Sequence, residues 1–128
     1  MGAERSRLVV ALQTGLLRAV AEFAADDRLA PHHARALATA AALDYVLMLA
    51  TGAAGVRIPH RDAERAMHDG IARAVDDLII VASAVAEIGT PAASAFAREA
   101  ATSLRTVVRE EALESDSRSF AVIALANA

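Results

Sequence analysis

The residues that could do chemistry in this chain are histidines and carboxylates spaced to share helix faces. His60, Glu64 and His68 stand four residues apart, so they lie along one side of a helix that turns about 100° per residue. In two other segments, Asp44 and Glu111 fall among large apolar residues at helical spacing. Imidazole and carboxylate groups that point into a helical bundle can hold a divalent transition metal. The sequence therefore predicts a metal site formed by His68, Glu64, Asp44, His60 and Glu111.

The same residues allow an interpretation without metal. Asp62 could cap the helix that follows Pro59, and His60 would then precede that helix. Glu64 and His68 could instead form hydrogen-bonded pairs that close one end of a bundle, because a buried carboxylate needs a partner. The spacing also departs from the Glu-x-x-His of ferritin-like di-iron bundles, since three residues separate Glu64 from His68. Whether a divalent metal is the cofactor therefore stays open.

Four segments of similar length, divided by proline and glycine, must position these residues. Thr90-Pro91 is typical of a helix start, and Gly52 or Gly55 is typical of a helix end. Four helices joined by short loops predict an all-α, up-down-up-down four-helix bundle, and we expect residues 1–128 to form a single domain. The segments expected to be helical are residues 4–26, 31 to 52 or 55, 59–88 and 91–114.

The apolar stripes of these segments predict which side chains form the core. In the second segment the expected inward residues are Leu37, Ala41, Leu47 and Met48, with Asp44 among them. For the other three segments, in chain order, the stripes are Leu8 or Val9, Leu12, Leu16, Ala19 or Val20 and Phe23; then Met67, Ile71, Val75, Leu78, Ala82 and Val85; then Phe96, Ala100, Leu104 and Val107.

The alanine content predicts assembly. Alanine occupies 34 of the 128 positions, and such small side chains bury little apolar area in a small domain. Helices that are apolar on more than one face favour a second partner. We therefore expect a homodimer or larger homo-oligomer, to which residues 120–125, an apolar tail or fifth helix, contribute. The apolar residues that lie off the main stripes are Leu17, Val46, Leu49, Ile80 and Val81.

Composition and charge make several partners and compartments improbable. All 13 basic residues are arginines, the net charge is −3, and the aromatic residues are few and scattered, so nucleic acid is not expected to bind. The chain has no cysteine, which fits a reducing compartment. Its longest uncharged stretches are shorter than the ~18 apolar residues of a membrane span. We therefore expect a cytoplasmic protein with no membrane span.

The sequence contains no phosphate-binding glycine loop and no nucleophile accompanied by a placed histidine and acid. It therefore favours a non-catalytic, oligomeric helical-bundle protein that acts by protein–protein interaction or assembly. One alternative is a metal-binding bundle with redox or hydrolytic activity at the His/carboxylate site. Another is a small-ligand-binding bundle with a pocket between alanine-lined helices near Tyr45 and Met48. Whether the chain is an enzyme, and which partner or substrate it takes, is not decided by these patterns.

Overall fold

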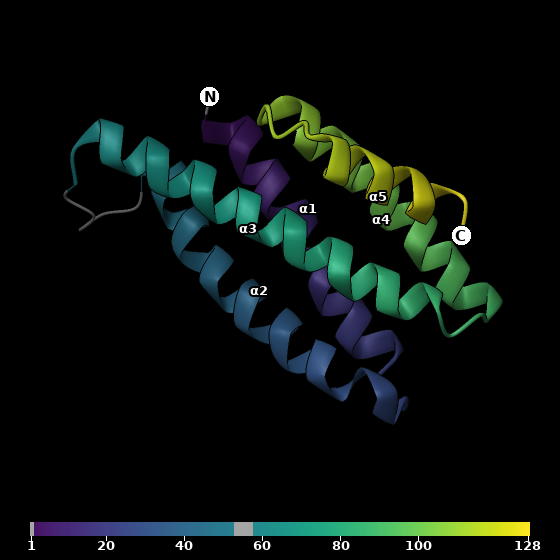
Figure 1. Cartoon of the computed structure of the whole chain (residues 1–128). Coiled ribbons are helices and arrows are strands. Elements are labelled where there is room, and N and C mark those ends of the chain that lie inside the picture. The colour runs from purple at the N-terminus through teal and green to yellow at the C-terminus, as the bar shows by residue number, and fades with distance from the viewer. Residues whose placement is uncertain (1, 53–57) are drawn as a thin grey trace.

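The computed structural model describes residues 2–52 and 58–128, and every element of secondary structure within them is a helix. Helices α1 to α4 run alternately up and down, and α5 lies beside α4 and α3 (Figure 1). This arrangement confirms the predicted all-α bundle and shows that the apolar tail is part of a fifth helix. The elements are α1 (Gly2–Glu22), the 3-10 helix η1 (Asp27–Leu29), α2 (Ala30–Thr51), α3 (His60–Ala86), α4 (Pro91–Glu110) and α5 (Asp116–Ala126).

The helix ends follow the local sequence signals. The Thr90 hydroxyl accepts a hydrogen bond from the Ala93 backbone N–H at 3.2 Å, and Pro91 stands in the first turn of α4. Gly52 ends α2 in a left-handed conformation, with φ of 67°, that a residue with a side chain rarely adopts. Gly55, the alternative end, lies outside the described residues. His60 begins α3, so the interpretation that placed it before the helix is wrong.

Helix α4 ends at Glu110, four residues before the predicted end at position 114. Ala112 takes a left-handed φ of 55°, and the Leu113 N–H donates to the Val108 carbonyl at 2.8 Å. This turn brings Leu113 back onto the core, where it is buried. Burial of Leu113 thus stops the helix at a position where the sequence has no glycine to mark the end, and it leaves Glu111 at the last turn facing inward.

The predicted core stripes of α1, α3 and α4 are confirmed. Their side chains form one continuous hydrophobic cluster with residues of α2 and α5. Of the apolar residues expected off the stripes, Leu17 and Ile80 are exposed, whereas Val46, Leu49 and Val81 belong to the core.

Helix α2 is rotated relative to the prediction. Leu37, Ala41 and Met48, expected inside, are exposed on its outer side. In this rotation Val46 packs against Gly70 of α3: a Cβ on Gly70 would lie only 2.5 Å from Cγ2 of Val46, so the two helices approach closely there. Because α2 is apolar on almost every side, its periodicity could not show which side would pack. The residues that α2 buries are Ala36, Thr39, Ala40, Leu43, Val46 and Leu49.

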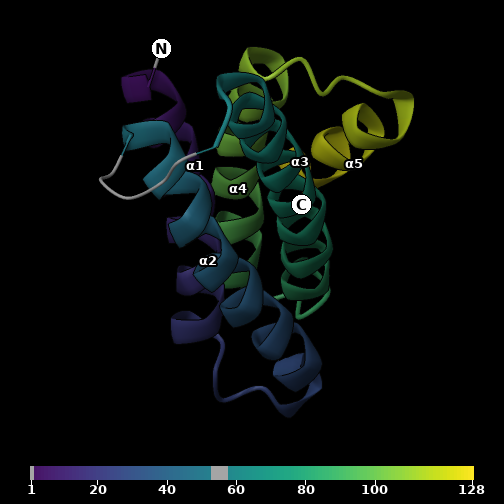
Figure 2. The same cartoon turned by 90° about the vertical axis from the view of Figure 1, so that its left-hand side faces the viewer.

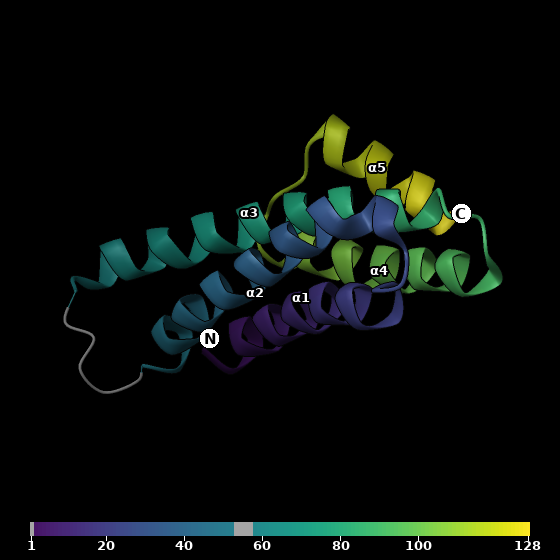
Figure 3. The same cartoon turned by 90° about the horizontal axis from the view of Figure 1, so that it is seen from below.

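Helices α1 and α2 lie side by side, and α5 lies across the bundle from α2 (Figures 2 and 3). Val122 and Leu125 are buried and pack α5 against the rest of the chain, whereas Phe120 and Ile123 are 79% and 58% exposed. Arg118 anchors α5 further, since its Nε donates to Oδ1 of Asp76 at 2.8 Å. The contribution of residues 120–125 to an oligomer stays a prediction.

Candidate functional site

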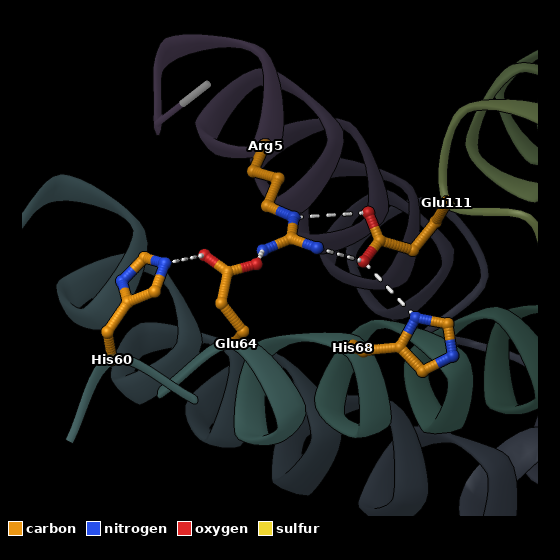
Figure 4. A network of polar contacts seen from close by, with 5 residues as sticks. All are labelled: Arg5, His60, Glu64, His68 and Glu111. Carbon is orange, nitrogen blue, oxygen red and sulfur yellow. Dashed lines mark hydrogen bonds and ion pairs between the residues drawn. The ribbon is translucent and has the colours of Figure 1, made fainter. Parts of the chain in front are cut away.

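A network of charged side chains occupies the end of the bundle where α1 begins and α4 ends. Arg5 comes from the first turns of α1, Glu64 and His68 from α3, and Glu111 from the residue after α4 (Figure 4). The guanidinium of Arg5 stands between the two carboxylates and bonds to both. The up-down order of the helices therefore brings together residues that are up to 106 positions apart in the chain.

Glu111 is the centre of this network. Its Oε1 accepts from Nη2 of Arg5 at 2.9 Å and its Oε2 accepts from Nε of the same guanidinium at 3.3 Å. Nδ1 of His68 lies 3.3 Å from the same Oε1, within hydrogen-bond distance. Two bonds from one guanidinium give the strong, two-pronged geometry that fixes both side chains.

Burial makes these pairs important. The Glu111 side chain is only 4% exposed, whereas the Arg5 and Glu64 side chains are 24% and 35% exposed. Burial acts to lower the pKa of Arg5, but its hydrogen bonds to Glu64 and Glu111 outweigh burial and raise that pKa above its usual value. Arg5 is therefore the fixed positive charge that makes a buried Glu111 tolerable.

The predicted site residues are only partly brought together. Glu64, His68 and Glu111 meet in the network. The His60 side chain is 90% exposed, and its Nε2 lies 3.7 Å from Oε1 of Glu64. Asp44 was expected to face the core, and this expectation is wrong. Asp44 is exposed on the rotated α2 and accepts from Nε2 of Gln13 at 2.7 Å.

Arg5 was missed by the sequence analysis although a signal existed. It precedes Val9 by four residues and Leu12 by seven, so it falls on the stripe of α1 that is buried. An arginine at that position near the start of a helix needs a carboxylate from a neighbouring helix. Glu64 and Glu111 are the carboxylates that it finds.

The network in its present form holds a guanidinium between its carboxylates. Within residues 2–52 and 58–128, no three His, Cys, Asp or Glu side chains are placed to hold a metal ion. A cleft of about 710 Å³ opens at the same end of the bundle, with Arg5, Glu64 and Glu111 among its walls. Tyr45 and Met48, near which a ligand pocket was expected, lie instead on the exposed side of α2.

The second feature is the surface that we call the outer α1–α2 face. Nε2 of Gln13 donates to the Ala40 carbonyl at 2.8 Å, which marks the line where the two helices meet. On α1, Val10 and Leu17 stand three residues before and four after Gln13, on its exposed side. The outer α1–α2 face consists of Val10 and Leu17 from α1 and of Ala34, Leu37, Ala38, Ala41, Tyr45 and Met48 from α2, all exposed.

Helix α2 is also the most apolar helix of the bundle by hydropathy. Among the described residues, Asp27–Thr51 is the one helical stretch long and apolar enough to cross a membrane, with a mean hydropathy of 1.3 over its most apolar window. One third of that window is buried in the bundle. Core helices of bundles without a membrane pass the same test, so the stretch by itself is a weak indication of a span.

No protein-family model, no curated protein and no solved structure matches the chain. Its function is therefore inferred from the polar network and the outer α1–α2 face.

Proposed function

We propose that the chain is a non-catalytic, oligomeric helical-bundle protein that acts by binding protein through the outer α1–α2 face. The observation that carries the proposal is the exposure of large apolar side chains on two adjacent helices. Tyr45 and Leu37 are 49% and 50% exposed, and Val10 and Leu17 are 47% and 44% exposed. Contiguous apolar surface of this kind is typical of a protein-binding surface, whereas single exposed apolar residues are not.

The charge distribution supports the same proposal. Between positions 36 and 51, α2 carries one charged residue, Asp44, and that carboxylate is bonded to Gln13 of its own chain. A helix whose outer side faces water normally carries charges there. Covering a half-exposed leucine or methionine contributes on the order of 1 kcal/mol, so several such side chains together can drive association.

Sedimentation over a dilution series tests this function. We expect the unmodified chain to form an assembly that dissociates on dilution, and Tyr45→Arg to shift the equilibrium to the monomer because it places a charge in the apolar contact. Thr102→Arg is the matched control, since Thr102 is exposed on α4, outside both the outer α1–α2 face and residues 120–125. A folded, unmodified chain that remains monomeric at every concentration would overturn the proposal.

A second candidate is a divalent-cation site in which a metal takes the place of the Arg5 guanidinium. The supporting observation is that Glu64 and Glu111 both bond to that guanidinium and that His68 contacts Glu111. Oxygen and imidazole ligands of this kind suit first-row transition metals. Elemental analysis of the dialysed chain and of Arg5→Ala tests it. Bound metal that is lost in Glu111→Gln supports the site, and metal-free protein in both chains after reconstitution contradicts it.

A further inference from the structure

We propose that the occupant of the outer α1–α2 face is a second copy of this chain, docked antiparallel about a two-fold axis at Ala41. This inference rests on the proposed function and names the partner and the register of that same face. It is carried by the spacing of the exposed residues on both helices and by the area that the two helices present.

Five of the six α2 residues of the outer α1–α2 face are spaced symmetrically about Ala41, and the sixth, Ala38, comes opposite the partner's Asp44. Ala34, Leu37, Ala41, Tyr45 and Met48 follow one another at intervals of three, four, four and three residues, so the spacing is the same in either direction. A two-fold axis at Ala41 places Leu37 opposite the partner's Tyr45. It places Ala34 opposite the partner's Met48, so that a small side chain meets a large one. Two-fold contacts require this kind of self-complementary surface.

The exposed apolar residues of α1 fit the same two-fold axis. Nε2 of Gln13 reaches both the Ala40 carbonyl and Oδ1 of Asp44, at 2.8 and 2.7 Å, so residue 13 of α1 lies level with the middle of α2. Val10 and Leu17 lie three residues before and four after that level. The axis that passes Ala41 therefore brings Val10 close to the level of the partner's Leu17, and the apolar positions of α1 coincide across the contact.

Small residues at the centre allow the two copies to approach. Ala38 and Ala41 are exposed beside the proposed axis. Alanine on both sides of a contact lets helix axes come nearer than the usual ~8–10 Å. Antiparallel docking also sets the positive end of each α2 dipole against the negative end of its partner.

The helix pair that carries the face is large enough for the contact of a stable dimer. Helices α1 and α2 have 21 and 22 residues, and at about 1.5 Å per residue they are roughly 30 Å long. Two such helices, each about 10 Å wide, present roughly 600 Å² in projection. Stable interfaces bury about 800 Å² of accessible surface per partner, and the accessible surface of a rough helix pair exceeds its projection.

Single-cysteine variants test the register, because the chain has no native cysteine. A disulfide requires Cα atoms within about 7 Å. On oxidation, we expect Ala41→Cys to cross-link most of the chain, because the two copies of position 41 meet at the axis. Ala34→Cys is the matched control: its two copies would stand about 21 Å apart along the helix axis and should give no cross-link. Both variants are first shown to sediment like the unmodified chain when reduced.

The outcomes separate this inference from the proposed function. Cross-linking at both positions means parallel docking, which overturns the register and leaves the proposed function standing. Cross-linking at neither position in an assembled chain also overturns the register, and Tyr45→Arg then decides the proposed function: loss of assembly keeps it, and unchanged assembly means another surface and overturns it. A monomeric unmodified chain overturns both. A monomeric chain that binds vesicles of phosphatidylcholine and phosphatidylglycerol would overturn both in favour of a lipid surface.

Discussion

The polar network and the outer α1–α2 face depart from the usual distribution of residues in opposite directions. In the network, a carboxylate is buried: the Glu111 side chain is 4% exposed. On the outer face, leucine, tyrosine and methionine lie in water. The network supplies its own partners, since Arg5 and His68 bond to Glu111 within the chain.

The outer α1–α2 face differs because its apolar side chains are exposed, and we propose that a partner from outside the chain covers them. A buried polar group that is paired within its own chain contributes to the stability of the fold, whereas exposed apolar surface contributes to binding. The comparison indicates that the charged cluster stabilises the fold, and under our proposal the capacity to interact lies on α1 and α2. Variants of the two regions should therefore separate stability from association.

The largest effect on stability is expected from Arg5→Ala. This change leaves the buried Glu111 without its charged partner, and breaking a buried pair costs ~3–5 kcal/mol. Because Arg5 is partly exposed, we expect a smaller loss of about 2 kcal/mol in the free energy of unfolding, measured by urea denaturation. Arg105→Ala, an exposed arginine on α4, is the control. Unchanged stability in Arg5→Ala would show that the network does not support the fold.

A second variant tests the contact that orients the outer α1–α2 face. Gly70→Ala would bring a methyl group within 2.5 Å of Val46, a side chain with little rotamer freedom. Overpacking costs ~1–3 kcal/mol and the gain in helix propensity returns ~1 kcal/mol, so we expect a net loss of about 1 kcal/mol.

Gly70→Ala should also weaken self-association, because displacement of α2 moves half of the face. Gly15→Ala is its control: there the new Cβ would lie 3.2 Å from the flexible end of Leu78, and stability should hardly change. Equal stabilities of the two variants in thermal unfolding would mean that the Val46–Gly70 contact does not set the rotation of α2.

The smallest effect is expected from Asp44→Ala, which removes the one charge among α2 positions 36–51. Loss of its exposed bond to Gln13 should cost a few tenths of a kcal/mol. Association should tighten about threefold, since a carboxylate no longer loses water in the contact. Sedimentation of this variant beside Asp69→Ala, on α3, measures the change. Weaker association of Asp44→Ala alone would show that the carboxylate itself binds the partner.

The sequence predicted most of the fold because α1, α3 and α4 each have one clear apolar stripe. The sequence also predicted that Glu64, His68 and Glu111 meet at one end of the bundle, since these residues lie on or beside those stripes. The sequence placed Asp44 wrongly because α2 carries alanines on every side, and helices of that composition pack equally well in several rotations. Tertiary contacts select among them, and the close approach of Val46 to Gly70 is one such contact. Arg5 was overlooked because an arginine in a first turn normally faces water.

The central claim, that the outer α1–α2 face is buried by a second copy, is tested most directly through Tyr45. The chain has one tyrosine and no tryptophan, so tyrosine fluorescence reports on this position alone. Acrylamide quenching is to be measured over a dilution series. If the face is the contact, Tyr45 will be protected at high concentration and become accessible as the assembly dissociates. Equal quenching at every concentration, in a chain that sedimentation shows to assemble, would contradict the claim.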